Sequence, residues 1–245
     1  MDDDISFPFE ELEEVESNVT KRFSCQKCGR PEKVCVCYTF PDAPIEISTT
    51  VHILQHPREQ DMRLLTTVPL LRECIPKDKG IIYRGRRFPE TKFKTLYDIL
   101  RDSQNAALLY PSSDAVTVEE YARETNSEAI DLFVLDGTWR EAKSIYYNCK
   151  FLHSMRKVKL AGHWKSEFVI KTQPNNDSVS TLEAVAIALG QIENKQELIE
   201  VARKPLKALC DFQINHGAQV HQSKEELAKL GIKYKCFDNR KDMIK

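Results

Sequence analysis

Long apolar runs are missing from this 245-residue sequence, and none approaches the roughly 20 residues that a membrane-spanning helix needs. A membrane-spanning role is therefore not expected. The N-terminus also lacks the basic region and apolar core of a secretory signal or transit peptide, so we expect a protein of the cytoplasm or the nucleus. A hydrophobic content of 41% with 30% charged residues is ordinary for a globular α/β protein of this length.

Basic residues are absent from the first 19 positions, which hold three Asp and five Glu. We interpret residues 1–22 as an acidic flexible tail. The rest of the chain carries 36 basic side chains against 29 of the 37 acidic ones. That surplus is compatible with a polyanionic partner, although it is also common on a solvated surface. Internal repeats and low-complexity tracts are absent as well.

From residue 47 onward, short apolar and β-branched runs alternate with amphipathic ones, which predicts an α/β fold with an open, mainly parallel sheet and flanking helices. The expected strands are 50–55, 80–84, 106–110, 132–135, 158–160 and 168–171. The expected helices are 63–73, 93–101, 118–124, 140–148, 182–193, 195–216 and 224–230. We divide the chain into the tail 1–22, a cysteine-rich segment with its linker 23–46, a main domain 47–232 and a C-terminal tail 233–245.

Half of the eight cysteines lie within thirteen residues in a C-x2-C-x6-C-x-C pattern, formed by Cys25, Cys28, Cys35 and Cys37. Disulfides are disfavoured in a chain without a secretory signal, and four thiolates separated by turn residues suit a tetrahedral zinc ion. We therefore predict a structural Zn²⁺ that folds a segment too short for a core of its own. A reduced thiol cluster or an iron–sulfur site is the alternative. Such a segment would offer phosphate groups three basic residues: Lys27, Arg30 and Lys33.

The segment Asp136-Gly137-Thr138-Trp139 follows an expected buried strand and precedes an expected helix. In open α/β sheets, ligands bind at the carboxyl edge of the strands, where a partly buried carboxylate can acquire a shifted pKa. The structural alternative is a helix cap, in which Asp136 or Thr138 accepts backbone N–H bonds. Trp139 is then a core anchor.

Three further segments place polar groups at strand or helix ends. "YRGRRF" gathers Arg84, Arg86 and Arg87 beside two aromatic residues, which suits phosphate contacts and base stacking but also a solvated loop. His56 with Arg58 follows the first strand, as a base or as a structural histidine. Ser180, three residues before Glu183, predicts a capping box on a helix whose first N–H groups can also bind a ligand.

Taken in their order along the chain, these segments resemble the DTW-domain family of tRNA-uridine aminocarboxypropyltransferases, over roughly residues 24–232. The resemblance implies a SPOUT-like α/β fold with a C-terminal trefoil knot and S-adenosyl-L-methionine as cofactor. It also implies transfer of the 3-amino-3-carboxypropyl group to N3 of a uridine in the tRNA D-loop, with release of 5′-methylthioadenosine. Two departures are Ser178-Val179 in place of Cys-Leu, and Lys171 in place of an arginine, which replaces a planar fork by a point charge.

The resemblance also implies roles for individual residues. Asp136 becomes the base for uridine N3 or the anchor of the cofactor's ammonium group, and Thr138 and Trp139 hold the carboxylate of its methionine part. The residues implied in cofactor binding are Leu135, Trp139, Leu160, Lys171, Gln173, Ser180, Thr181 and Leu182. Those implied in tRNA binding are Lys33, Arg58, Arg84, Arg86 and Arg87. An RNA methyltransferase and a non-catalytic zinc-containing RNA-binding protein remain the rival functions. The sequence does not decide between monomer and homodimer.

Overall fold

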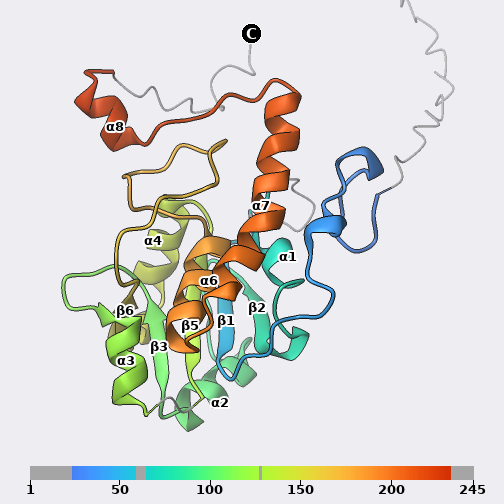
Figure 1. The fold of residues 1–245 in the computed structure, drawn as a ribbon. Helices are drawn as coiled ribbons and strands as arrows, with labels where there is room; N and C mark the ends of the chain where they lie inside the picture. The colour runs from blue at the N-terminus through green and yellow to red at the C-terminus, as the bar shows by residue number, and fades with distance from the viewer. Residues whose placement is uncertain (1–23, 59–64, 127–128, 233–245) are drawn as a thin grey trace, which may run out of the picture.

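The computed structural model describes residues 24–58, 65–126 and 129–232 (Figure 1). The tails expected at 1–22 and 233–245 lie outside these ranges. Within the described residues, none of the helices combines the length and the apolar character that crossing a membrane requires.

The described strands form one open sheet of six parallel strands in the order β2-β1-β5-β3-β6-β4. Their bounds are β1 (Thr50–Gln55), β2 (Gly80–Arg84), β3 (Ala106–Leu109), β4 (Val116–Thr117), β5 (Asp131–Asp136) and β6 (Arg156–Lys159). The middle strands β1 and β5 are buried on both faces, which explains why their sequences are largely apolar and do not alternate strictly between apolar and polar residues.

Helices cover both faces of this sheet. Their bounds are α1 (Val68–Leu71), α2 (Lys94–Asp102), α3 (Val118–Glu124), α4 (Trp139–Asn148), α5 (Lys150–Ser154), α6 (Thr181–Ile192), α7 (Glu197–Asn215) and α8 (Lys224–Lys229). Helices α6 and α7 lie across one face, in orange in Figure 1. Ile53 and Val134 belong to the core on the side of α1, α3, α6 and α7, whereas Leu54 and Phe133 belong to the core with α2, α4 and α5. Because successive side chains of a strand point to opposite faces of the sheet, each strand contributes to both cores.

The cysteine-rich segment, blue in Figure 1, lies beside α7. It contains two 3₁₀ turns, η1 (Glu32–Val34) and η2 (Cys37–Thr39). Val36 is fully buried and Phe40 nearly so, and both belong to the apolar cluster that includes Leu206 of α7. The segment therefore shares the core of the main domain through two apolar side chains.

Most expected elements are confirmed: two strands and the helix 118–124 have the expected ends, and most others agree within a few residues. The expected strand at 168–171 is wrong. Its backbone N–H groups are used locally, because that of Phe168 donates to the Ser166 hydroxyl and that of Lys171 to the Phe168 carbonyl. The Val169 carbonyl accepts from the N–H of His221, so the stretch forms turns instead of a ladder.

Two short elements, β4 and α5, were not expected. The helix expected at 63–73 is reduced, in its described part, to the single turn α1; positions 63 and 64 lie outside the described residues.

Candidate active site at the carboxyl edge of the sheet

Three neighbouring strands end side by side in polar residues. The register pairs Gln55 of β1 with Arg84 of β2 on one side and with Asp136 of β5 on the other. The Gln55 amide nitrogen donates to Asp136 Oδ2 at 3.0 Å, and Arg84 Nε donates to the Gln55 amide oxygen at 2.9 Å. A continuous row of hydrogen bonds therefore crosses the carboxyl edge of the sheet. In open parallel sheets, this is the edge at which ligands bind.

Asp136 is the buried acid of this edge, with 6% of its surface exposed. Burial raises its pKa above the ordinary aspartate value, against hydrogen bonds from Gln55 and Thr181 and the nearby charge of Lys171. Thr181 begins α6, and Lys171 lies in the segment before that helix. The fold thus brings two of the expected cofactor residues to the carboxylate of Asp136.

The next residues turn the chain sharply into α4. Gly137 has φ +152°, and a Cβ atom there would lie 3.1 Å from Cβ of Glu141 and 3.3 Å from Cβ of His56, so a side chain would crowd this corner. Thr138 is the N-cap of α4. Its hydroxyl accepts from the Glu141 N–H, while the Glu141 carboxylate accepts from the Thr138 N–H and hydroxyl. Of the two residues proposed as the cap, Thr138 is the one.

Trp139 is the first residue of α4, and 41% of its surface is exposed. The interpretation of this indole as a core anchor is therefore wrong. A large, amphipathic side chain at the carboxyl edge of the sheet is instead accessible to a ligand.

His56 lies beneath this corner and is 5% exposed. Its Nδ1 lies 3.4 Å from the Glu141 carboxylate, and the guanidinium of Arg58 lies 3.8 Å from the same carboxylate. Burial raises the pKa of Glu141, but its hydrogen bonds with Thr138 and the charges of His56 and Arg58 outweigh that effect and leave it lowered. These contacts favour the structural interpretation of His56.

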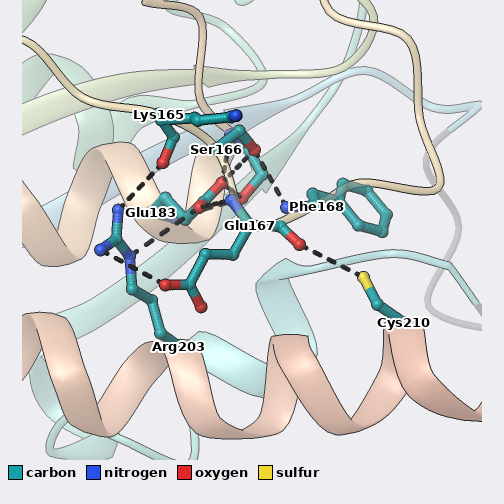
Figure 2. A network of polar contacts seen from close by, with 8 residues as sticks. Lys165, Ser166, Glu167, Phe168, Glu183, Arg203 and Cys210 are labelled. Atoms are coloured by element: carbon teal, nitrogen blue, oxygen red, sulfur yellow. Dashed lines mark hydrogen bonds and ion pairs between the residues drawn. The ribbon is translucent and has the colours of Figure 1, made fainter. Parts of the chain in front are cut away.

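Glu183 has no exposed surface and joins α6 to the segment before it (Figure 2). Oε2 accepts from the N–H and hydroxyl of Ser180, at 2.9 and 2.8 Å, and from the Ser166 hydroxyl at 2.7 Å. Oε1 accepts from the Glu167 N–H at 2.7 Å and lies 3.9 Å from Arg203 Nε of α7. The capping box predicted at Ser180 is confirmed, and it also fixes the chain that leads to Lys171.

The other expected cofactor residues lie next to these strands and to α6 in the sequence. Leu135 precedes Asp136 on β5, and Leu160 follows β6; both are half-buried. Gln173 is also half-buried, and its carbonyl accepts the N–H of Lys224. Leu182 has no exposed surface and lies in the apolar core, so only its backbone belongs to the start of α6.

Arg84 at the end of β2 and Arg86 and Arg87 in the loop after it are exposed. The aromatic residues around this loop, Tyr83 and Phe88, are 9% and 2% exposed. The prediction that these rings stack on bases is therefore not met, because both pack in the core with α2. The guanidinium groups remain accessible to phosphates, as does that of Arg58 after β1.

The four sulfur atoms of the cysteine cluster lie within 4.8 Å of one another. Cys25 and Cys37 are 3.5 Å apart, and Cys28 and Cys35 are 3.7 Å apart. A tetrahedral zinc ion with Zn–S bonds of about 2.3 Å separates its sulfur atoms by about 3.8 Å. The donor set therefore fits Zn²⁺.

The cysteines of the cluster have pKa values shifted in opposite directions, and burial raises the pKa of Cys37. Backbone N–H groups of Cys28 and Lys27 lower the pKa of Cys25 to about 6. The Arg30 guanidinium donates to the Cys28 carbonyl at 3.2 Å and is 3% exposed, so this arginine is not the surface phosphate contact that the sequence suggested. Lys33 is exposed.

A cavity of about 600 Å³ lies away from the sheet edge, between residues 38–42 and α7. Its lining includes both lysines and aspartates: Lys204, Lys207, Asp42 and Asp211. None of the expected site residues lines it.

The sequence interpretation missed Gln55, and treated Glu183 only as a capping partner. The signal for Gln55 was a polar side chain at the last position of an otherwise apolar strand, where a buried polar group needs partners. Arg203 carried no comparable signal, because it reaches Glu183 from another helix.

A family model described as "DTW domain" matches residues 22–214. The chain belongs to the DTW domain family. It is 39% identical over 225 residues to tRNA-uridine aminocarboxypropyltransferase 2 of Macaca fascicularis, covering 92% of this chain and 75% of the relative. The Drosophila melanogaster protein of the same name is 39% identical over 209 residues, covering 85% and 82%. The Arabidopsis thaliana tRNA-uridine aminocarboxypropyltransferase A is 29% identical, covering 82% and 83%. No solved structure matches the chain.

Proposed function

We propose that this DTW-domain protein transfers the 3-amino-3-carboxypropyl group of S-adenosyl-L-methionine to N3 of a uridine in the tRNA D-loop and releases 5′-methylthioadenosine. The names of its relatives support the reaction class. The observation that carries the proposal is the buried Asp136 carboxylate, which stands at the carboxyl edge of the sheet beside the start of α6.

The uridine N3–H is weakly acidic and has to lose its proton before the nitrogen attacks carbon. In our proposal Asp136 accepts that proton, while the N3–C bond forms and the C–S bond breaks with its electron pair going to sulfur. S-adenosyl-L-methionine supplies a sulfonium whose thioether is a good leaving group. The task of the protein is therefore alignment and proton acceptance, and general-base help is typically worth ~10²–10⁴-fold.

The residues around Asp136 offer groups that suit this cofactor. Lys171 provides a cation for its carboxylate, and the start of α6 at Thr181 provides N–H groups for oxygen atoms. The exposed indole of Trp139 can donate to the same carboxylate. Because the hydroxyl and N–H of Thr138 are bonded to Glu141, we assign Thr138 to holding Trp139 in place. Half-buried apolar side chains and nearby backbone would contact adenosine: Leu135, Leu160, Gln173, Ser180 and Leu182.

We assign tRNA contacts to exposed basic residues near the same edge and on the cysteine segment: Arg58, Arg84, Arg86, Arg87 and Lys33. Arg84 ends β2, Arg86 and Arg87 follow it, and Arg58 follows β1, whose last residue, Gln55, lies between Arg84 and Asp136. Phosphate contacts of this kind position an RNA without reading its sequence.

For the four cysteines we propose a structural Zn²⁺ that holds residues 23–46 against α7, with 47–232 as the catalytic domain. We also propose that this domain has the SPOUT-like knotted topology of the family, in the cytoplasm or the nucleus. The all-parallel sheet and the packing of α6 on β5 support the topology.

The by-product separates this function from its rivals. Purified protein is incubated with S-adenosyl-L-methionine and unmodified tRNA, and the small molecules are analysed by chromatography and mass spectrometry. Release of 5′-methylthioadenosine supports the transferase. S-adenosylhomocysteine would instead indicate a methyltransferase, and tRNA binding without any by-product would indicate an RNA-binding protein.

A further inference from the structure

Gln55 is fully buried and uses both ends of its side-chain amide on charged groups. One neighbour, Arg84, is exposed at the end of β2; the other, Asp136, is buried at the end of β5. The distances are 2.9 Å from Arg84 Nε to the amide oxygen and 3.0 Å from the amide nitrogen to Asp136 Oδ2. Gln55 therefore connects the surface of the molecule to its buried acid.

The orientation of this amide follows from its partners. A guanidinium group can only donate, so the amide oxygen has to face Arg84, and the amide nitrogen then has to face Asp136. In that orientation Gln55 donates to the Asp136 carboxylate, a bond that favours its ionised, proton-accepting form. Without Arg84, the amide is free to turn and present its oxygen to Asp136 instead.

We propose that Gln55 is a positioning residue that links tRNA contacts at Arg84 to the carboxylate of Asp136. This inference rests on the proposed function, in which Arg84 contacts RNA and Asp136 is the base. The bond from Arg84 Nε fixes the orientation of the Gln55 amide, so an RNA phosphate that contacts the exposed Arg84 guanidinium acts on Asp136 through Gln55. Asp136 is then kept ready to accept the N3 proton when RNA is bound.

Other groups also act on Asp136, and the test has to leave them in place. Thr181 reaches it from α6 and Lys171 from the preceding segment; both lower its pKa, whereas the nearby carboxylate of Glu141 on α4 raises it. His56, after β1, faces Glu141 and lies beneath the same corner. A change confined to Gln55 removes one donor and adds no charge.

Gln55→Met has nearly the same shape as glutamine but cannot donate. Loss of the donor raises the pKa of Asp136 further, so the carboxylate is protonated at a higher pH and the base is lost earlier as pH falls. We expect the acid limb of the single-turnover rate, measured with saturating tRNA and cofactor, to move upward by about half to one pH unit. Arg84→Met is expected to move it in the same direction, and the double variant no further than Gln55→Met alone.

The matched control is Gln191→Met, because the Gln191 amide also uses both ends, but on the backbone of Ala161 rather than on Arg84 or Asp136. Its acid limb should stay in place. Because Arg84 is exposed, Arg84→Met tests the proposal even if Gln55→Met does not fold.

A second measurement does not depend on activity. The carboxyl carbon of Asp136, labelled with ¹³C-aspartate and assigned with Asp136→Asn, is titrated by NMR in the zinc-loaded full-length protein. A higher titration midpoint in Gln55→Met and in Arg84→Met supports the link even if wild-type protein forms no aminocarboxypropyl product. Equal midpoints in all three proteins would overturn it and leave Gln55 with a structural role only.

Discussion

The Thr138 hydroxyl donates a hydrogen bond of 2.8 Å to the Glu141 carboxylate, which together with the reciprocal bond caps α4. Because Thr138 fills that role, Asp136 is not needed as a cap. It points instead into the row formed with Gln55. Thr138 therefore has a structural role, whereas Asp136, two residues earlier, is a buried acid at the carboxyl edge of the sheet.

Asp136→Asn should lower the single-turnover rate by about 10²–10⁴-fold while leaving cofactor affinity within a few-fold of the wild-type value. Asparagine keeps the shape and can accept from Gln55 but cannot accept a proton. Because burial raises the pKa of Asp136, the wild-type rate should fall as pH decreases through a value above the ordinary aspartate range, and this limb should vanish in the variant. A variant that binds cofactor and turns over normally would remove Asp136 from the chemistry.

Glu183→Gln should destabilise the protein by about 2–4 kcal/mol, because the buried carboxylate accepts from Ser166, Glu167 and Ser180, and a glutamine would place a donor against one of them. The matched control is Glu120→Gln in the exposed capping box of α3, with an expected cost below about 1 kcal/mol. Urea denaturation measures both. Equal costs would mean that burial of the Glu183 network contributes nothing extra.

Cys28→Ser should abolish zinc binding and expose the segment 24–46 to proteolysis, because four thiolates are needed to close a structural site. Zinc content is measured by inductively coupled plasma mass spectrometry. Cys74→Ala is the control, since the buried thiol of Cys74 lies outside the cluster and donates to the Leu70 carbonyl. Loss of zinc from both variants, or from neither, would contradict the assignment.

Removing charge from the loop after β2 should weaken tRNA binding and its salt dependence. Arg86→Met and Arg87→Met should each reduce the slope of log K against log salt by about one, as expected for a lost phosphate contact. Arg101→Met is the control, because Arg101 is exposed but pairs with Glu90 and Asp98 at the end of α2. Filter binding at several salt concentrations gives the slopes, and an unchanged slope in the loop variants would return these arginines to a solvated surface.

The sheet could be predicted from the sequence because its information is local. Largely apolar runs at 50–55 and 132–135 predicted buried parallel strands, and Ser180 with Glu183 predicted a helix start within four residues. The position of Asp136 at a strand end likewise predicted the edge at which it lies.

The rest depends on contacts between distant parts of the chain. The apolar stretch 168–171 has the composition of a strand, but its partner is His221 rather than another strand. The strand order places Gln55 between Arg84 and Asp136, and no local sequence pattern predicts that order. The same is true of the ion pair between Glu183 and Arg203. For the same reason the burial of Arg30, Tyr83 and Phe88 was not foreseen.

The most direct test of the account is nucleoside analysis of tRNA. Unmodified tRNA is incubated with S-adenosyl-L-methionine and either wild-type protein or Asp136→Asn, digested to nucleosides and analysed by mass spectrometry. The account predicts 3-(3-amino-3-carboxypropyl)uridine with the wild-type protein and, at equal time, far less with the variant. A methylated nucleoside, or no modified uridine from wild-type protein that binds both cofactor and tRNA, would contradict it.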